Sequence, residues 1–443
     1  MSPSIYSVLK DKDNIFVVIV QTLLENEEEK RQRKYDTIVG KETIKEDIFM
    51  QKFTYCVPTE IIFGKDTERE CGKMVKRHGG KKVLIVYGGG SVRHSGLLER
   101  VEHSLEEEGI SYVECGGVTP NPRLSFAEMG VKKGIEEGVD FILAVGGGST
   151  IDAAKAIAHG TANPGVSLWD IWTKKESLTK TLKVGAVLTI SAAGSETSDS
   201  AVLTNEATGK KLGLGTELNR PVFAIMNPEL TYTLPKYQIG CGIADIMMHT
   251  LERYFSQGED TPLTDRIAEG LLKTVIEAGR TADQRPDDYE ARAALMWAGS
   301  LSHNDLTGAG RTVFMQVHQL EHELSGMDDR IAHGAGLSAL WASWARYVYR
   351  HNISRFARYA VNVWNLDMDF EHPEKTALAG IRATEKFFCE LNMPVTLKEL
   401  GVSPSSFKEM AEKCSDHGKR TLTGVKELDE ADMIRIYEMA LGE

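Results

Sequence analysis

Two glycine-rich turns, each directly after a predicted buried strand, constrain the fold of this chain more than any other feature. One turn, YGGGS, follows the apolar run at residues 83–87, and the other, VGGGS, follows the run at 141–145. A third β-branched run lies between them at 111–115, and segments with helical periodicity separate the three runs. Strands that alternate with helices in this way form a parallel sheet. The sequence therefore predicts a βαβαβ unit.

The second half of the chain has a different character. Further extended runs at 185–190, 200–204 and 222–226 precede the proline-containing stretch NPELTYTLP. Amphipathic periodicity typical of helices dominates beyond this stretch. The longest predicted helices are residues 240–257, 263–281, 288–304, 312–325 and 334–349. We therefore expect an α/β domain at residues 50–235 and an all-helical domain at residues 236–443.

The first 49 residues differ from the rest in composition. They contain the charge-rich stretches ENEEEKRQRK and KETIKEDIF, and turn and strand signals begin only near Phe53. We interpret residues 1–49 as an N-terminal extension outside the fold, with Met50 as an alternative start. The apolar run at 15–24 is too short to cross a membrane and lacks the small-residue cleavage site of a secretory signal.

Charge and cysteine content narrow the class of partner. The net charge of −12 opposes binding to nucleic acid or to an anionic membrane, because phosphate partners require a concentrated basic face. The six cysteines are scattered and include no CxxC pair, so neither a disulfide framework nor a Cys-ligated zinc site is indicated. We expect a cytoplasmic protein that acts on a small molecule and binds neither nucleic acid nor membrane.

The two glycine turns are suited to binding phosphate groups. Glycine lets the backbone approach a phosphate closely, and the free amide groups at a helix start favour its negative charge. A tight turn without a ligand is the alternative for either turn alone, but two such turns in one unit favour a nucleotide. Neither turn matches the GxGxxG or P-loop patterns. The first turn offers no acid for the ribose and is followed by Arg93, so we expect NADP(H) to be preferred over NAD(H).

An acidic residue and several histidines in the helical half have the spacing of metal ligands. Asp245 and His249 are four residues apart, as are His318 and His322, so each pair projects from one face of a helix. His333 follows after a short link. One carboxylate and three imidazoles can bind a divalent first-row metal and leave positions open for a substrate oxygen. One histidine pair alone is more often a surface or core feature, but the combination favours a metal site.

Five motifs, in order along the chain, resemble those of one known family. They are AVGGGSTIDAAKAIA, LTISAAGSE, NPELTYTLP, GIADIMMHTLERYF, and HQLEHELS followed by HGAGLS. Together they resemble the iron-containing (group III) alcohol dehydrogenases, particularly their NADPH-dependent butanol dehydrogenase and aldehyde reductase branch, over residues 51–443. The resemblance implies a Rossmann-like dinucleotide-binding domain at 50–235, an all-α metal-binding domain at 236–443 and a site between them. This is the fold shared with dehydroquinate synthase. The resemblance also implies a homodimer.

The resemblance also implies roles for individual residues. Asp245, His249, His318 and His333 would hold Fe²⁺ or Zn²⁺, and His322 would lie beside the nicotinamide as a catalytic residue. The implied cofactor contacts are Gly89, Gly90 and Ser91 at the adenosine ribose and its 2′-phosphate, Gly147, Gly148 and Ser149 at the pyrophosphate, Asp152 at the helix start, and the stretch from Thr189 to Ser195 along the cleft. The link between His318 and His333 is one residue longer than is usual in the family, which makes His333 the ligand that departs from the pattern.

The predicted function is the metal-dependent interconversion of primary alcohols and aldehydes, of the butanol and butanal type, with NADP(H). The metal would polarise the substrate oxygen during hydride transfer, and His322 would relay the proton. Polyol oxidation, as in glycerol dehydrogenases, and metal-assisted cyclisation, as in dehydroquinate synthases, stay open on the same fold. So does a non-catalytic nucleotide- or metal-sensing role. Six further residues are candidates for either the cleft or the core: Trp169, Trp172, Thr307, Arg311, Phe314 and Gln316.

Overall fold

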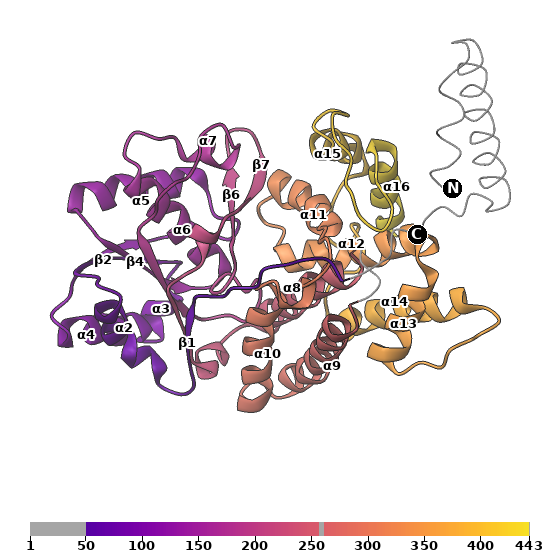
Figure 1. Cartoon of the computed structure of the whole chain (residues 1–443), viewed down its shortest axis with the longest axis horizontal. Helices are drawn as coiled ribbons and strands as arrows, with labels where there is room; N and C mark the ends of the chain where they lie inside the picture. The colour runs from indigo at the N-terminus through magenta and orange to yellow at the C-terminus, as the bar shows by residue number, and fades with distance from the viewer. Residues whose placement is uncertain (1–49, 257–260, 443) are drawn as a thin grey trace, which may run out of the picture. The chain divides into compact units, whose positions relative to one another are not determined.

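Six parallel strands form the main sheet of the computed structural model, which describes residues 50–256 and 261–442 (Figure 1). Their order across the sheet is β1-β8-β5-β4-β2-β3. The strands are β1 (Glu60–Phe63), β2 (Lys82–Tyr87), β3 (Ser111–Gly116), β4 (Phe141–Gly146), β5 (Lys183–Leu188) and β8 (Phe223–Met226). The predicted parallel βαβαβ unit is confirmed as β2, β3 and β4 with their connecting helices.

Helices cover both faces of this sheet, which explains why β2 and β4 are apolar on both sides. The helices of this region are α2 (Cys71–Arg77), α3 (Ser91–His94), α4 (Leu97–Glu107), α5 (Leu124–Glu137), α6 (Gly148–Ala162) and α7 (Leu168–Trp172). Ile151 and Ile157 of α6 belong to the core on one face, and Leu98 and Val101 of α4 belong to the core on the other. Because β2 and β4 run parallel and each glycine turn directly follows one of them, both turns lie at the carboxyl edge of the sheet.

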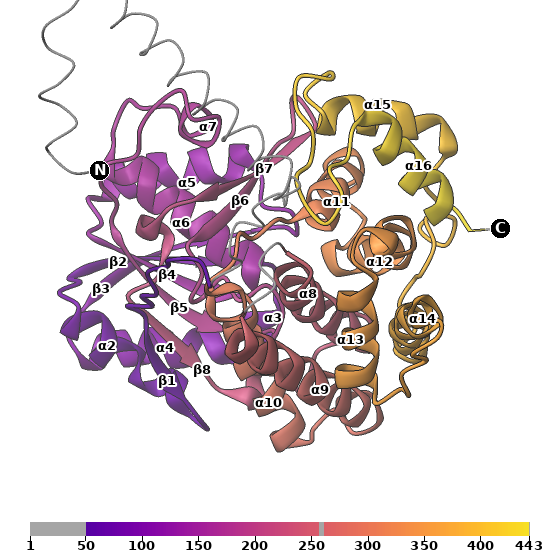
Figure 2. The same ribbon diagram turned by 45° about the vertical axis from the view of Figure 1, so that its right-hand side comes forward.

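An antiparallel hairpin stands apart from the main sheet. It consists of β6 (Ser200–Asn205) and β7 (Lys210–Gly215). The sequence predicted β6 but not β7, because KKLGLG contains no β-branched residue and two glycines. The hairpin packs against α6 on one side and against α11 (Gln316–Met327) on the other, as Figures 1 and 2 show. It therefore bridges the sheet region (residues 60–226) and the helices that follow it.

The helical region (residues 236–440) contains no named strand among its described residues. Its α-helices, besides α11, are α8 (Lys236–Tyr254), α9 (Pro262–Gln284), α10 (Tyr289–Ser302), α12 (His333–Val348), α13 (Ile353–Trp364), α14 (Pro373–Glu390), α15 (Phe407–Cys414) and α16 (Glu430–Ala440). Short 3₁₀ turns lie at several connections. The fold is thus a Rossmann-like α/β region followed by an all-α region, as predicted. The boundary at residue 235 stays a prediction.

Helix α11 begins at Gln316, four residues later than predicted. The carboxylate of Glu252 accepts hydrogen bonds from the backbone N–H groups of Val317, at 2.6 Å, and His318, at 3.2 Å. The N–H of Phe314 instead donates to Ser256 Oγ. A side chain from α8 therefore satisfies the free donors that every helix start presents, and this tertiary contact sets the first residue of α11.

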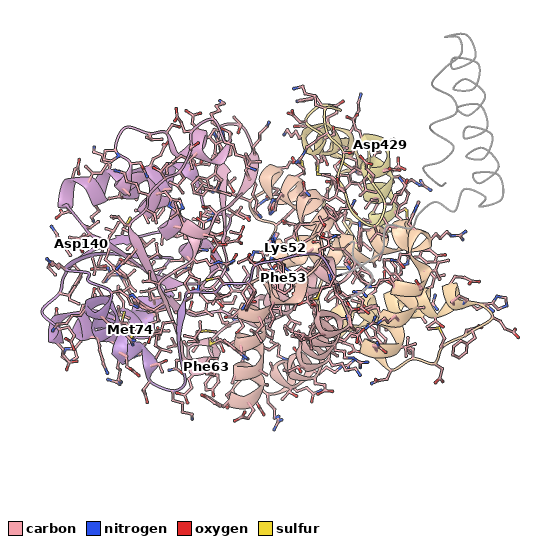
Figure 3. All side chains as sticks on the ribbon, in the orientation of Figure 1. Lys52, Phe53, Phe63, Met74, Asp140 and Asp429 are labelled. Atoms are coloured by element: carbon pink, nitrogen blue, oxygen red, sulfur yellow. The ribbon has the colours of Figure 1, made fainter. Side chains whose placement is uncertain are left out.

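The segment before β1 is extended and reaches the helical region. The N–H of Gln51 donates to the carbonyl oxygen of Gly310 at 2.9 Å, and Thr312 Oγ1 donates to Gln51 Oε1 at 2.8 Å. Lys52 and Phe53 follow on this segment (Figure 3). The predicted extension at residues 1–49 lies outside the described residues. None of the described helices has the length and apolar character needed to span a membrane.

Candidate metal and cofactor site in the cleft

A cleft of about 760 Å³ lies between the sheet region and the helical region. The predicted cofactor residues that line it are Ser91, Gly147, Gly148, Ser149, Asp152, Thr189 and Ser195. The predicted metal and catalytic residues that line it are Asp245, His249, His318, His322 and His333. Gly89 and Gly90 are absent from the described lining, although they adjoin Ser91. The structure thus brings side chains as far apart in the sequence as Ser91 and His333 to one surface.

Three of the predicted metal ligands, all histidines, converge on one carboxylate oxygen of the fourth. Oδ1 of Asp245 lies 3.3 Å from Nδ1 of His249, 3.7 Å from Nε2 of His318 and 3.8 Å from Nε2 of His333. The rings of His318 and His333 are 5.3 Å apart between centroids. With the extra residue in the link before it, the ring of His333 still lies beside Asp245.

The chemistry of this group fits a divalent cation. Oδ1 of Asp245, Nδ1 of His249 and Nε2 of His318 are buried and have no hydrogen-bond partner among the described residues. Buried polar atoms normally have hydrogen-bond partners. Three unpartnered atoms that face one point therefore indicate a partner that all three share, such as a cation. One ligand atom each from Asp245, His249 and His318 lie within 4.8 Å of one another. Oxygen and imidazole nitrogen are ligands that both Fe²⁺ and Zn²⁺ accept.

Two buried glutamates orient the histidines. Nδ1 of His318 donates to Glu252 on α8, and Nδ1 of His333 donates to Glu321 on α11. Each bond fixes the ring and leaves Nε2 directed toward Asp245. Carboxylate partners of this kind set the tautomer and basicity of metal-binding histidines. We did not predict either glutamate from the sequence, although Glu252 lies three residues after His249 on the same helix.

Burial and nearby charges shift the pKa values of His318 and Glu321. Burial alone would lower the pKa of His318, but the carboxylates of Glu252 and Asp245 outweigh it and raise that pKa to about 9. Burial would likewise raise the pKa of Glu321, but His333 and Lys211 hold it well below its usual range. A cation bound at Nε2 of His318 would therefore release a proton.

His322 lies beside this group but is not one of the three histidines that face Asp245. Its ring centroid is 5.6 Å from that of His333, and it lines the cleft. Burial, together with the nearby charges of Lys211 and His333, holds the pKa of His322 well below its usual value. His322 therefore faces the space that a cofactor and substrate would occupy, as a neutral imidazole.

His303 is a further cleft residue that the sequence did not identify. Its ring packs edge to face against His249, with 3.9 Å between centroids, and it lines the cleft. Nδ1 of His303 lies 3.3 Å from Nη2 of Arg253. Because guanidinium can only donate, Nδ1 accepts and the ring proton is on Nε2. A single histidine without a spaced partner gives no signal in sequence.

The second glycine turn leads into α6 against a tightly packed neighbour. A Cβ at Gly147 would lie 2.3 Å from Cγ2 of Ile190, so no side chain fits there. Asp152, in the first turns of α6, accepts hydrogen bonds from Ser195 Oγ at 2.5 Å and from the N–H of Val202 at 2.9 Å. Asp152 therefore also ties the β6–β7 hairpin to the predicted pyrophosphate site.

The cation after the first glycine turn is already paired. Nη2 of Arg93 donates to Glu114 at the end of β3 and, at 2.6 Å, to Tyr87 Oη. Tyr87 Oη in turn donates to Glu114 at 2.6 Å. The guanidinium of Arg93 is therefore held by Glu114 and Tyr87, and the preference for NADP(H) stays a prediction. The sequence missed this contact because Glu114 lies on the neighbouring strand.

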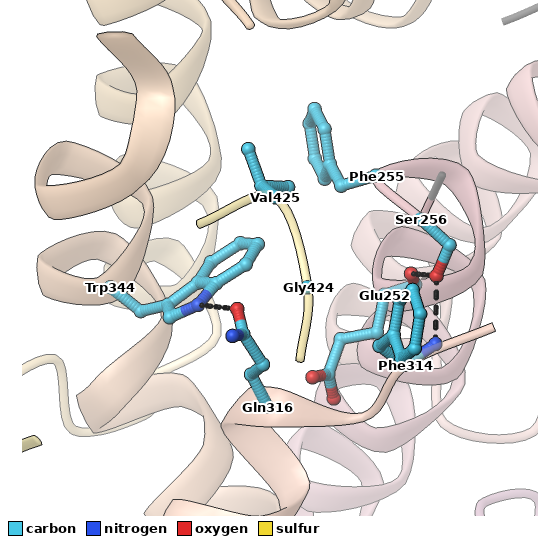
Figure 4. A pocket seen from close by; sticks show the side chains of 8 residues that line it. All are labelled: Glu252, Phe255, Ser256, Phe314, Gln316, Trp344, Gly424 and Val425. Carbon is cyan, nitrogen blue, oxygen red and sulfur yellow. Dashed lines mark hydrogen bonds between the residues drawn. The ribbon is translucent and has the colours of Figure 1, made fainter. Parts of the chain in front are cut away.

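The six residues that were candidates for cleft or core do not line the cleft. Phe314 and Gln316 border a separate small cavity, where Trp344 Nε1 donates to Gln316 Oε1 at 3.0 Å (Figure 4). Gln316 also donates to the carbonyl oxygens of Leu422 and Lys426 and so anchors that loop. Trp172, Thr307 and Arg311 are buried, and Trp169 packs partly buried against the core of the sheet region.

Comparison with known proteins gives a consistent result over both regions. A model described as iron-containing alcohol dehydrogenase matches residues 58–228, and the C-terminal model of the same family matches 241–441. NADH-dependent butanol dehydrogenase A of Clostridium acetobutylicum is 39% identical, over 88% of this chain and 99% of its own. The NADPH-dependent aldehyde reductase YqhD of Escherichia coli is 36% identical, over 88% and 100%. The solved structure of NADH-dependent butanol dehydrogenase A from Thermotoga maritima superposes with a TM-score of 0.85 at 35% identity, over 89% and 99%.

Proposed function

The chain belongs to the iron-containing alcohol dehydrogenase family, and on that premise we propose that it reduces and forms butanal-type aldehydes with NADP(H) at the Asp245 site. It is an oxidoreductase of alcohols and aldehydes that uses a nicotinamide cofactor. The observation that carries the proposed site is the convergence of three histidines on one oxygen of Asp245 in the cleft.

Asp245, His249, His318 and His333 would hold Fe²⁺ or Zn²⁺ in this proposal. When bound, such an ion supplies Lewis-acid polarisation of the substrate oxygen. The protein contributes the orientation: Glu252 and Glu321 fix the rings of His318 and His333.

The cofactor would extend along the cleft from Ser91 to His322. The free N–H groups at the start of α6, beside Gly147, would bind the pyrophosphate. During alcohol oxidation a hydride passes from the substrate carbon to the nicotinamide, and the hydroxyl proton must reach solvent. His322, which lines the cleft, would accept that proton and return it during aldehyde reduction.

The proposed preference for NADP(H) rests on the first glycine turn and on Arg93. The first glycine turn carries no acid that would repel a 2′-phosphate, which favours NADP(H). Arg93 would supply the positive charge only after leaving Glu114. The named relatives include both NADH- and NADPH-dependent enzymes.

We also propose that the protein is a homodimer in the cytoplasm. Light scattering after size exclusion would test the dimer, and cell fractionation would test the location.

The test is a steady-state assay of butanal reduction with NADPH and with NADH, combined with metal analysis of the protein. We expect turnover that scales with bound iron or zinc and a higher kcat/KM with NADPH. Comparable or better kcat/KM with NADH would contradict the cofactor preference. Absence of NADPH oxidation at every metal loading would favour a polyol substrate.

A further inference from the structure

Lys211 is a buried cation that the sheet region inserts into the helical region. It lies on β7, and its side chain is 4% exposed. Its ammonium nitrogen is 2.8 Å from Ser325 Oγ, 3.0 Å from Asn121 Oδ1 and 3.4 Å from Glu321 Oε2. A buried ammonium group requires such partners, since losing them would leave its charge uncompensated.

Lys211 shares one carboxylate with a proposed metal ligand. Oε2 of Glu321 accepts the hydrogen bond from Nδ1 of His333 and also faces the ammonium group of Lys211. Lys211 Nζ itself lies 3.4 Å from Nδ1 of His333. The position of this carboxylate, and with it the ring of His333, therefore depends on two contacts. One of these two contacts, the one from Lys211, comes from the sheet region.

The same cluster is not a second metal site. Ligand atoms of Glu321, His322 and His333 lie within 4.8 Å of one another, which is close enough to hold an ion. The ammonium group of Lys211 is already 3.4 Å from two of these side chains. It provides the positive charge that the buried carboxylate needs, so a second divalent cation would be repelled.

The hairpin holds Lys211 firmly against α11. A Cβ at Gly326 would lie 2.9 Å from the carbonyl oxygen of Gly209, in the turn between β6 and β7, so the two backbones are in direct contact. At its other side the hairpin is tied to α6 through Asp152 and Val202. A continuous set of contacts thus leads from the predicted pyrophosphate site to His333.

We propose that Lys211 is a positioning residue that holds metal ligand His333 through Glu321 and so makes metal retention depend on the placement of the β6–β7 hairpin. The inference rests on the proposed function in one respect, namely that His333 binds the metal. It assigns Lys211 a task in the metal centre even though its backbone belongs to the cofactor-binding half.

The test measures how quickly purified, metal-loaded protein loses its metal to excess EDTA, followed by metal analysis. We expect Lys211→Met to lose metal about 10- to 100-fold faster than the unaltered protein, as when other partners of ligand histidines are removed. Lys210→Met is the matched control, because Lys210 is the preceding residue of β7 and is exposed. It should retain metal normally. Should Lys211→Met fail to fold by circular dichroism, Lys211→Gln, which keeps a hydrogen-bonding group without the charge, replaces it.

A double variant tests the route through Glu321. If Lys211 acts through this carboxylate, Lys211→Met combined with Glu321→Gln should lose metal no faster than Glu321→Gln alone. Additive losses would overturn the proposal. So would a Lys211→Met protein that keeps its metal and only binds NADPH more weakly, since Lys211 would then be a cofactor contact. His333→Ala distinguishes a failure of this inference from a failure of the proposed metal site. Normal metal retention in that variant would refute the proposed ligand set instead.

Discussion

Nδ1 of His318 donates a hydrogen bond to the carboxylate of Glu252, a residue of the helix that also carries Asp245 and His249. Oε1 and Oε2 of Glu252 also accept hydrogen bonds from the N–H groups of Val317 and His318, the second and third residues of α11. One carboxylate therefore fixes both the position of α11 and the ring of His318, its proposed metal ligand.

Replacing Glu252 with Gln should weaken metal binding by about 10- to 100-fold. Glu252 accepts three hydrogen bonds through two oxygens, whereas Gln has a single acceptor oxygen and its N–H₂ group cannot accept from these donors, so the fixed orientation of the His318 ring is weakened. Competition with a metallochromic chelator measures the affinity. Glu269→Gln is the matched control, since Glu269 is a buried carboxylate bonded to Tyr254 and Arg358, away from the ligands. Equal affinities in Glu252→Gln and in the unaltered protein would refute this role.

His318→Ala and His322→Ala should separate metal binding from proton transfer. His318 faces Asp245, so its removal should deplete the metal. His322 lines the cleft outside that group, so its removal should leave metal content nearly unchanged and lower kcat by about 10²- to 10⁴-fold. Metal analysis and turnover with butanal are measured on the same preparations. Equal metal loss in both variants would show that the assigned roles are wrong.

Glu114→Gln should shift the cofactor preference toward NADPH. The variant releases Arg93 from its ion pair and makes the guanidinium available to a 2′-phosphate. We expect the ratio of kcat/KM for NADPH to that for NADH to rise only about 5-fold, because the ion pair is exposed to solvent and such pairs are weak. Glu106→Gln removes an equal charge nearby, where Glu106 accepts from Tyr112, and should leave the ratio unchanged. An unchanged ratio in both variants would mean that Arg93 does not contact the cofactor.

Glu323→Gln should stabilise the protein more at pH 8 than at pH 5. Burial raises the pKa of Glu323 to about 7, despite the opposing charges of Lys413 and Arg420. The folded state therefore binds this proton more tightly than the unfolded state does, and stability falls as the pH rises from about 4.5 through 7. Gln resembles the neutral acid, so the gain in Tm should be small at pH 5 and larger at pH 8. A gain that is equal at both values would contradict the assignment.

Five of the six strands of the main sheet were predicted from the sequence, and the edge strand β1 was not. The sequence also indicated Asp245 and the three histidines that face it as candidate ligands. Apolar runs that end in glycine predicted β2 and β4, and the i, i+4 spacing predicted that Asp245 and His249 share a helix face. The resemblance added the distinction between His318 and His322. These features depend on local periodicity or on several motifs in fixed order, both of which are visible in one chain.

The features that the sequence did not predict depend on contacts between segments that are distant along the chain. Nothing local distinguishes Glu321, which is fully buried, from Glu323 two residues later, since packing decides which acid faces inward. The pairing of Arg93 with Glu114 joins α3 to the strand β3. The strand β7 lacks the residues that favour strands, and its pairing with β6 stabilises it instead.

The link before His333 has a consequence for how such enzymes can be recombined. Asn121 Nδ2 donates to the carbonyl oxygens of Asp329, at 3.4 Å, and Ile331, at 3.5 Å, and Arg123 pairs with the Asp329 carboxylate. The lengthened link is therefore matched to a partner surface more than two hundred residues earlier in the chain. A chimera that joins this helical half to the sheet half of a relative would inherit the link without its counterpart. The two halves are consequently not interchangeable modules, and an exchange that preserves the metal centre must carry residues 121–123 together with 328–333.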